Sequence, residues 1–393
     1  MQKVAVFFGG KSYEHDISVL TGLQAIQVMD VTKFNPFPVY VNKVGRIFIG
    51  DQLLNPRFYP VLEHSEAQLT EVVIPVGETF PCLQKRFGLF KKKFPFDIAL
   101  LAFHGAEGES GGFQGLFDAA NIPYTGASSL ASAVSMDKVI TKDVCRALGI
   151  NVLPHVVVSK PTTDMFDITK ILAGFDMKFP VMAKPRSLGS SVGIHRCENI
   201  DNLMAACINI FKLGDDALIE PFVENLVEYN IAAVRGTDGR VLTSAIEKPN
   251  PKGNVLSFAD KYLSDGGKKK GVKLKGGKLS VMPTQELLQS RREYHPAGLT
   301  AKQEKFIRES AAALYTHLGA AGSPRIDFIA NGKTGEIWLN EVNPIPGSFA
   351  FYLWAASIDN PMSYQELVSV ILHNVNSRAQ NIDLKHSGSV VFK

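Results

Sequence analysis

The run Lys184-Pro-Arg-Ser-Leu-Gly-Ser-Ser-Val-Gly193 follows a short apolar segment, Phe179–Lys184, that has the character of a β-strand. A strand that delivers a lysine into a Gly-Ser loop offers phosphate oxygens a cation, backbone N–H groups and hydroxyls. Glycine also lets the backbone approach a ligand closely. The run has no Gly-Lys-Ser/Thr ending, which disfavours a P-loop of the Walker type. A plain surface turn stays the alternative for this motif taken alone.

Two later motifs, Arg325-Ile-Asp327 and Glu341-Val-Asn343, place oxygen ligands at the ends of neighbouring strands. Mg²⁺ takes carboxylates together with substrate phosphates, so Asp327, Glu341 and Asn343 are predicted to bind a metal that bridges ATP. Residues two apart in a strand share a face, as Glu341 and Asn343 do here. The alternative is an exposed polar strand end.

By the same spacing, Arg325 shares a face with Asp327. A fixed guanidinium beside a metal site can stabilise charge on a phosphoryl group or on a tetrahedral oxyanion. A structural salt bridge to Asp327 or Glu341 is the alternative. The order of the three motifs on alternating apolar segments predicts an enzyme that uses ATP to activate a carboxylate.

The composition fits an intracellular α/β protein. The 393 residues carry a net charge of +4, too small to argue for binding to nucleic acid or to a membrane surface. No segment approaches the ~18 apolar residues of a membrane span. The four cysteines form no C-x-x-C pair, which is typical of reduced thiols. We therefore expect a cytoplasmic location, where ATP is available.

The first third of the chain alternates buried strands with helices. Val4–Phe8 is a strand that ends in Gly9-Gly10, Ile17–Met29 has helical spacing, and Ile98–Phe103 is a strand followed by His104. Continuous apolar strands separated by helices predict a parallel sheet covered on both faces. Ligands of such sheets gather at the carboxyl ends of the strands. One helix is expected from Ser128 to Leu148.

Three polar residues follow these first-domain strands. The loop His104-Gly-Ala-Glu-Gly-Glu109 can orient the ammonium and carboxylate of a substrate, although His104 could equally be a buried histidine bonded to backbone. Glu14 could bind a substrate ammonium, and a carboxylate at a helix start explains it nearly as well.

Together these residues resemble the D-alanine–D-alanine ligases of the ATP-grasp superfamily, from about Val4 to Leu353. The similarity rests on eight motifs: Gly9-Gly-Lys-Ser-x-Glu14-x-x-x-Ser18, His104-Gly-x-x-Gly-Glu109, Tyr124-Thr-Gly-Ala127, Ser135-Met-Asp-Lys138, Lys184-Pro…Gly-Ser-Ser-Val-Gly193, Lys261-Tyr262-Leu263, Arg325-Ile-Asp327 and Asn340-Glu-Val-Asn-Pro-x-Pro-Gly347.

The resemblance implies an α/β ATP-grasp fold in three parts: a parallel-sheet substrate-binding domain over 1–127, a small ATP-grasp subdomain over 128–225 and a large catalytic subdomain over 226–393. It also implies a homodimer that uses ATP and two ions of Mg²⁺ or Mn²⁺ to join two molecules of D-alanine for peptidoglycan. A lid is expected over Pro249–Leu263 to protect an acyl phosphate from water.

The resemblance assigns a role to each site residue. Glu14 would bind the first ammonium in a triad with Ser190 and Tyr262, and Arg325 and the backbone N–H of Gly347 would form the oxyanion site. His104, Glu109, Tyr352 and Leu353 would contact the substrates. The ATP site would comprise Lys138, Lys184, Ser191, Glu220, Val223, Glu228 and Lys261, and the metal site Asp327, Glu341 and Asn343.

The chain departs from the family pattern at Ala259, where the family has a glutamate two residues before the lid lysine, in a longer Lys-rich loop before His295, and at Tyr352. The Pro-Gly motif usually continues Met-x-Ser-x-Ser-Leu, and the last serine receives the carboxylate of the second substrate. Here Tyr352 stands in its place, in the run Ser348-Phe-Ala-Phe-Tyr-Leu353. Tyrosine still carries a hydroxyl but is much larger. D-lactate, D-serine, or another amino acid or amine therefore stays open as the acceptor. An ATP-binding protein without ligase activity and a biotin-dependent carboxylase are the more distant alternatives.

Overall fold

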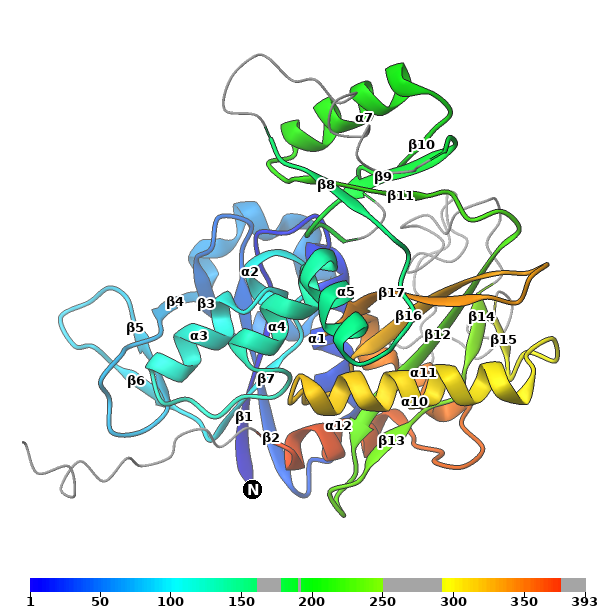
Figure 1. Ribbon diagram of the computed structural model, residues 1–393. Helices are drawn as coiled ribbons and strands as arrows, with labels where there is room; N and C mark the ends of the chain where they lie inside the picture. The colour runs from blue at the N-terminus through cyan, green and yellow to red at the C-terminus, as the bar shows by residue number, and fades with distance from the viewer. Residues whose placement is uncertain (161–177, 190–191, 250–291, 376–393) are drawn as a thin grey trace, which may run out of the picture.

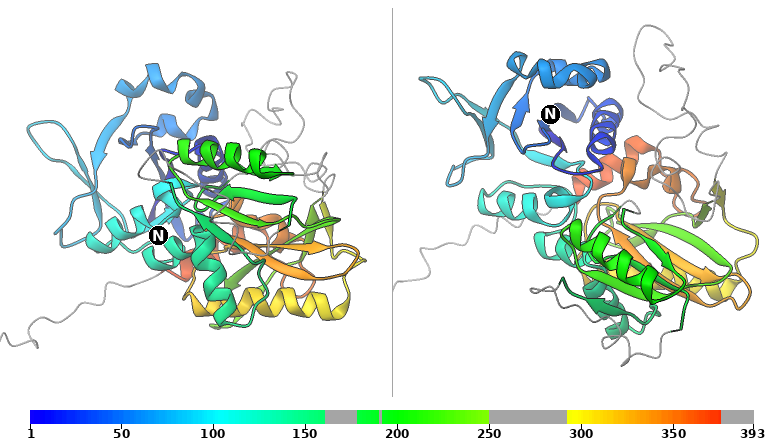
Figure 2. Two further views of the ribbon diagram at one scale, coloured as in Figure 1. Left: turned by 45° about the horizontal axis from the view of Figure 1, so that its top comes forward. Right: turned by 90° about the horizontal axis from the view of Figure 1, so that it is seen from above.

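The computed structural model describes residues 1–160, 178–189, 192–249 and 292–375. The strands form three separate sheets, each drawn from one stretch of the sequence. In Figure 1 the first sheet lies on the left in blue and cyan, the second at the top in green, and the third at the lower right in green and orange. Seen from above in Figure 2, the second sheet and its helix lie over the third sheet.

The first sheet has seven strands in the order β6-β5-β4-β3-β2-β1-β7. They are β1 (Gln2–Gly9), β2 (Phe34–Val41), β3 (Ile47–Ile49), β4 (Thr70–Val73), β5 (Cys82–Lys85), β6 (Lys93–Pro95) and β7 (Ile98–Leu101). β2, β1 and β7 are parallel, as the sequence predicted, whereas every other pair in this sheet is antiparallel. The turn from Asn42 to Arg46 is too short for the crossover connection that parallel strands need, so β3 pairs with β2 in the antiparallel direction.

Helices cover both faces of the parallel part, as expected. Successive residues of a strand point to opposite faces, and β1 presents fully buried Phe7 and Phe8 in this way. The Phe7 ring lies 5.0 Å from that of Phe117 on α3 (Gly112–Ala119), and Phe8 packs beneath Gly22 of α1 (His15–Val28). The short helix α2 (Ala106–Glu109) precedes α3, and η1 (Asp51–Leu54), η2 (Pro56–His64) and η3 (Glu66–Gln68) connect β3 to β4.

The second sheet is antiparallel, with strand order β10-β9-β11-β8. Its strands are β8 (Val156–Val158), β9 (Val181–Pro185), β10 (His195–Cys197) and β11 (Ala217–Pro221). Helix α7 (Ile200–Lys212) packs its apolar side, including Leu203 and Ile210, onto this sheet. The opposite face of the sheet is therefore available to the third sheet.

The third sheet is also antiparallel and has the order β15-β14-β12-β16-β17, with β13 paired to β12. Its strands are β12 (Leu226–Arg235), β13 (Val241–Thr243), β14 (Glu247–Pro249), β15 (Arg292–Tyr294), β16 (Arg325–Asn331) and β17 (Ile337–Asn343). Helix α10 (Ala301–His317) packs Ile307 and Leu314 into one core with Ile326 and Phe328. Arg325 and Asp327 alternate with these two residues, so they lie on the face away from α10.

The helix expected from Ser128 to Leu148 is two helices, α4 (Ser129–Met136) and α5 (Lys138–Ala147). Asp137 separates them in an extended conformation, and its Oδ1 accepts hydrogen bonds from the backbone of Val139 and Ile140. Aspartate is a favoured N-cap because its carboxylate satisfies N–H groups at a helix start. This break places Lys138 in the first turn of α5, next to the second sheet.

The last described elements are η4 (Gly347–Ala350), α11 (Phe351–Ala355) and α12 (Tyr364–His373). Trp354, Leu353 and Leu367 belong to the same core as the first sheet, although they come from the far end of the chain. Each sheet falls inside one predicted range, and the domain boundaries themselves stay a prediction. Within the part of the chain that the structure describes, no helix is long and apolar enough to cross a membrane.

The contact between α1 and β1 gives a test of the packing. A methyl group added at Gly22 would lie 2.3 Å from Phe8 Cδ1 and 2.8 Å from its Cβ. Overpacking of this kind costs about 1–3 kcal/mol, so Gly22→Ala should lower the free energy of unfolding measured in urea. Gly298→Ala is the control, because a Cβ there meets nothing within 4 Å. Equal losses in the two variants would contradict this packing.

Candidate active site

A row of polar side chains crosses the third sheet from edge to edge. The strand register pairs Tyr294 with Glu247, Asn230 with Glu247, Asn230 with Asp327, and Asp327 with Glu341. Directly paired residues place their side chains on the same face of a sheet. These five residues, here called the polar row, therefore lie on the face away from α10.

Arg325 and two of the proposed metal ligands, Asp327 and Asn343, form one hydrogen-bonded group at this row, and Glu341 is the cross-strand partner of Asp327. Arg325 donates to both oxygens of Asp327, from Nε to Oδ1 and from an Nη to Oδ2, each at 2.7 Å. Asn343 donates from Nδ2 to Asp327 Oδ2 at 3.0 Å. The salt bridge considered as an alternative for Arg325 is therefore present. It also fixes the guanidinium on the face that carries Glu341 and Asn343.

The second sheet brings lysines to the same place. Lys184 on β9 donates from Nζ to Asn340 Oδ1 on β17 at 3.0 Å, and its Nζ lies 2.6 Å from Glu220 Oε2 on β11. Lys138 lies across the same gap, with Nζ 3.7 Å from Glu341 Oε2 and donating to the carbonyl of Leu188 at 2.7 Å. The basic segment near 184 and the acidic strands near 327 and 341 therefore face each other.

Glu220, for which the resemblance implied a contact with adenine, lies between two lysines in the structure. Its carboxylate is buried between Lys184 and Lys142, whose Nζ lies 2.6 Å from Glu220 Oε1. Burial acts to raise the pKa of Glu220, but the two ammonium groups outweigh it and lower this pKa to about 2. Burial lowers the pKa of Lys142 and of Lys138.

Lys142 was absent from the predicted site. It follows Lys138 by four residues on one helix, which puts both on one face, and this spacing was the signal available in the sequence. Lys138, Lys142 and Lys184 contribute three positive charges, and Glu220 and Glu341 contribute two negative ones, which leaves one positive charge. Such an excess, held at low solvent exposure, favours an anionic ligand such as a phosphate group.

From the first domain, Glu109 and His104 hold the loop after β17. Glu109 accepts hydrogen bonds from the backbone N–H of Gly105 at 2.8 Å and of Ile345 at 3.0 Å. Burial, with a smaller contribution from Glu14, raises its pKa to about 8. Burial lowers the pKa of His104 to about 3, and its Nε2 lies 2.9 Å from Thr21 Oγ1. The His104 ring is therefore buried at this junction, and its contact with a substrate stays a prediction.

The loop held in this way has an uncommon backbone. Ser348, Phe349 and Ala350, directly after Gly347, have φ values of 52°, 52° and 54°. Non-glycine residues rarely adopt this conformation, which persists where the surroundings impose it. The N–H of Ser348 donates to Thr21 Oγ1 at 3.0 Å, and that of Phe349 to the Pro346 carbonyl at 2.8 Å.

Glu14 lies between two glycine backbones. A methyl group built on Gly105 would come within 2.9 Å of Glu14 Oε2, and one built on Gly189 within 3.4 Å. The carboxylate therefore faces the Gly-Ser loop that follows β9. Ser190 and Ser191 lie outside the described residues, as do Lys261, Tyr262 and the expected lid beyond Pro249.

The other predicted residues that the structure describes lie on α11, directly after β11, and on β12. Tyr352 on α11 is buried near the polar row, with the Arg292 guanidinium 4.0 Å from its ring centroid. Leu353 points its side chain into the core, and its carbonyl accepts from the N–H of Ala245 at 3.2 Å. Val223 is buried after β11, and Glu228 lies on β12 beside Ile329.

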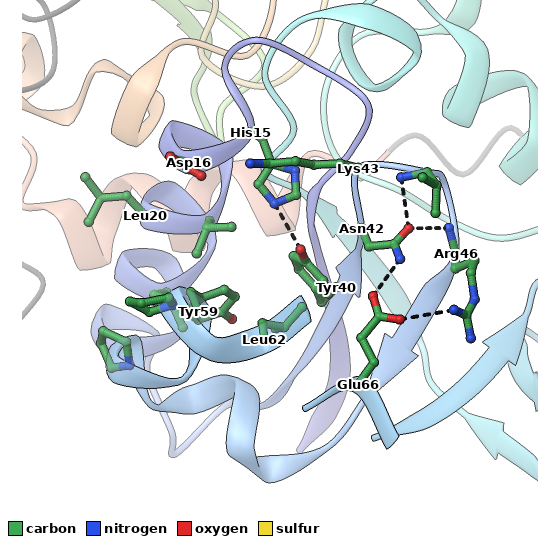
Figure 3. Close-up of a pocket in the computed structure, with 15 residues that line it drawn as sticks. His15, Asp16, Leu20, Tyr40, Asn42, Lys43, Arg46, Tyr59, Leu62 and Glu66 are labelled. Atoms are coloured by element: carbon green, nitrogen blue, oxygen red, sulfur yellow. Dashed lines mark hydrogen bonds and ion pairs between the residues drawn. The ribbon is translucent and has the colours of Figure 1, made fainter. Parts of the chain in front are cut away.

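His15, next to Glu14, supports the turn at Gly9-Gly10. Its Nδ1 donates to the Gly10 carbonyl at 2.7 Å, so Nε2 accepts from the Tyr40 hydroxyl at 3.0 Å. Figure 3 shows this pair beside a cavity of about 740 Å³, with Tyr59 and Leu62 on one side and Lys43 and Arg46 on another. Neither His15 nor the cavity is marked by a periodic pattern or a motif spacing in the sequence.

Comparison with known proteins decides the family. The model of the D-ala D-ala ligase N-terminus matches residues 3–127, and that of the C-terminus matches residues 144–276 and 285–373. The chain belongs to the D-alanine–D-alanine ligase family. The D-alanine--D-alanine ligase of Thermosipho melanesiensis is 30% identical over 357 residues, 91% of this chain and 90% of that protein. That of Chlorobaculum tepidum is 32% identical over 361 residues, 88% of each.

Solved structures of ligases share the fold. The D-alanine-D-alanine ligase from Coxiella burnetii aligns over 94% of this chain and 92% of its own, with a TM-score of 0.73 at 23% identity. VanG D-Ala:D-Ser ligase from Enterococcus faecalis aligns over 94% and 98%, with a TM-score of 0.72 at 24% identity. The predicted ATP-grasp fold and the assignment to an ATP-dependent ligase family are confirmed.

The buried charges around Glu220 give a prediction about stability. Glu220→Gln would leave Lys142 and Lys184 without a buried counter-charge, which should lower the free energy of unfolding at pH 7 by about 3–5 kcal/mol. Because the folded-state pKa of Glu220 is lowered, the wild-type advantage is complete above the ordinary value of 4.5 and fades as pH falls toward about 2. Urea denaturation across this pH range measures it.

Asp238→Asn is the matched control, because Asp238 pairs with Arg240 at the surface and should leave stability unchanged. A Glu220→Gln variant as stable as Asp238→Asn at pH 7 would contradict the buried-charge account.

Proposed function

We propose that this chain activates D-alanine as an acyl phosphate with ATP and joins it to a second D-alanine, supplying a peptidoglycan precursor. The observation that carries the proposal is the Lys184–Asn340 hydrogen bond of 3.0 Å, which sets Lys184 of the second sheet, with Lys138 of α5, against the carboxylates of the third sheet. In this site Lys138 and Lys184 bind the ATP phosphates, together with Ser191 and Lys261. Glu220 and Val223 contact the adenine and Glu228 the ribose, and the Glu220 carboxylate also holds Lys142 and Lys184 in place.

Asp327, Glu341 and Asn343 fit a magnesium site. Mg²⁺ prefers oxygen ligands and completes its shell with phosphate oxygens. Asp327 and Glu341 are cross-strand partners, and Asn343 uses Nδ2 toward Asp327, so its amide oxygen is not consumed by that bond. Within the described ranges no three His, Cys, Asp or Glu side chains gather to hold a metal alone, consistent with ligands shared with ATP. Two ions, with Mn²⁺ as a substitute, would neutralise charge on the phosphates.

The reaction divides between the two halves of the site. A carboxylate oxygen of the first D-alanine, whose ammonium Glu14 binds with Ser190 and Tyr262, attacks the γ-phosphorus and releases ADP. The amine of the second D-alanine then attacks the acyl carbon, forming the C–N bond and losing a proton, and the C–O bond to phosphate breaks. Arg325 and the Gly347 N–H stabilise the oxyanion between these events. His104 and Glu109 position the Gly347 loop.

The second candidate function is a ligase with a different acceptor, because Tyr352 stands where the family has the serine that receives the acceptor carboxylate. The solved neighbours include ligases named for D-Ala and for D-Ser acceptors at similar TM-scores, so the fold does not choose between them. We propose in addition a cytoplasmic location and a homodimer, as expected for the family.

The deciding experiment measures phosphate release and product mass for purified protein with ATP and Mg²⁺ across D- and L-amino acids and hydroxy acids. D-Alanyl-D-alanine from D-alanine alone is the expected result, abolished by EDTA and restored by Mg²⁺ or Mn²⁺. Product with another acceptor alone would favour the second candidate. ATP binding without product for any substrate would reject both.

Arg325→Ala should lower kcat by about 10²–10³-fold, because a donor to the oxyanion is lost. ATP binding, measured by calorimetry, should persist, since the lysines remain. Arg308→Ala is the control: Arg308 lies on α10, where it donates to the Ser244 carbonyl at 2.8 Å, away from the polar row. An unchanged kcat for Arg325→Ala would remove this residue from the mechanism.

Tyr352→Ser should shift the acceptor preference toward D-alanine, because it restores the small hydroxyl typical of the family. Competition between D-alanine and D-serine, D-lactate or larger acceptors, read by product mass, measures the shift. Tyr364→Phe is a control on the neighbouring helix, where the ring stacks on Phe351 at 4.4 Å. An acceptor profile that does not move would mean that Tyr352 does not line the second-substrate site.

A further inference from the structure

Arg292 is a charged residue on the face of the third sheet that carries the polar row, and the proposed reaction does not use it. It begins β15, and its Nη1 donates to both oxygens of Glu247, at 2.9 and 2.7 Å. Glu247 is fully buried and also accepts from Asn230 Nδ2 at 2.9 Å. A carboxylate with this many fixed donors holds the guanidinium in one orientation.

The guanidinium is held over the ring of Tyr352, 4.0 Å from the ring centroid. In the part of the chain that the structure describes, the hydrogen bonds of Arg292 use Nη1 alone. A guanidinium carries five N–H donors, so Nε and Nη2 can serve a ligand. Arg292 thus combines a fixed position with spare donors.

Arg292 lies close to the reacting centre. Glu247 and Asp327 are two strands apart in the polar row, about 10 Å at the usual strand spacing. Tyr352 lies in this region: its ring is beneath the Arg292 guanidinium, and the pKa of its hydroxyl is raised by burial first and is also affected by the charges of Glu247, Arg325 and Asp327. A small molecule whose amine reaches the oxyanion site can therefore place its other end against Arg292.

We infer that Arg292, fixed by Glu247 above Tyr352, binds the carboxylate of the second substrate and makes this site specific for acceptors that carry a carboxylate. The inference rests on the proposed ligase function and deepens it. A guanidinium pairs with a carboxylate through two parallel hydrogen bonds, whereas a tyrosine hydroxyl offers one uncharged donor. The cation thus replaces the serine hydroxyl that the family uses. Simple amines and amides are excluded as acceptors because they leave the charge of Arg292 unpaired.

The test is a competition in one vessel between D-alanine and D-alaninamide as acceptors, with D-alanine as the donor. The amide has no carboxylate to be phosphorylated, so it can serve as an acceptor alone. The ratio of D-alanyl-D-alanine to D-alanyl-D-alaninamide, read by mass spectrometry, cancels any loss of folded enzyme or of donor activation. Wild type should favour D-alanine by at least about a hundredfold.

Arg292→Gln should reduce this ratio at least tenfold, by loss of the dipeptide while the rate of amide product changes less than twofold. Arg292→Lys should retain an intermediate ratio. Lys248→Gln is the control, since Lys248 is the next residue after Glu247 on β14 and pairs instead with Glu293 at 3.7 Å. The control should keep the wild-type ratio.

Equal falls of both products in Arg292→Gln would show a structural role and overturn the inference. A wild-type enzyme that uses the amide as readily as D-alanine would also overturn it, even if the variants fail to fold. Absence of any ATP-dependent product with wild type and every amino acid would instead reject the proposed function, on which this inference rests.

Discussion

The ammonium group of Lys184 lies 2.6 Å from a carboxylate of its own sheet, Glu220, and 3.0 Å from the amide oxygen of Asn340 on the facing sheet. Burying an ammonium is costly unless it is paired and hydrogen-bonded, so Glu220 is what allows Lys184 to stand in this gap. Lys142 supports the same carboxylate from α5. The contact between the two sheets is therefore stabilised by a small buried ion network whose excess charge is positive.

A second constraint fixes the other wall of the site. The loop after β17 carries Gly347 and three residues with positive φ, a conformation that local sequence does not favour. It is imposed from the first domain, through Glu109 on the N–H of Ile345 and Thr21 on the N–H of Ser348. First-domain residues thus act on the proposed oxyanion site through the backbone, and burial keeps His104 neutral at this junction.

The sequence predicted the fold and the motif-bearing part of the site because strand alternation and glycine-rich exits are local signals. It placed Arg325 and Asp327 on one face by their spacing, and the 2.7 Å contacts confirm that placement. It missed the break at Asp137, where a capping carboxylate interrupts an otherwise helical pattern. It did not locate β3, β4, β5 and β6, because strands of three or four residues are too short to show a clear alternation. The catalytic, metal and ATP roles stay predictions.

Partners that come together only through sheet register could not be found from sequence spacing. Arg292, Glu247 and Asn230 come from three strands, and their contact depends on the pairing of β15, β14 and β12. The sequence therefore indicated candidate residues for the ATP-binding part of the site but did not indicate Arg292 in the acceptor part. The lysines and the proposed metal ligands lie in short motifs, whereas Tyr352, the residue proposed to face the acceptor, lies outside the family pattern. Tyrosine in place of serine at position 352 would remove one polar contact to the acceptor carboxylate. A charged residue on another strand, such as Arg292, can replace that contact. Acceptor choice can therefore change through the edge strands of the third sheet while the ATP-binding half keeps its geometry.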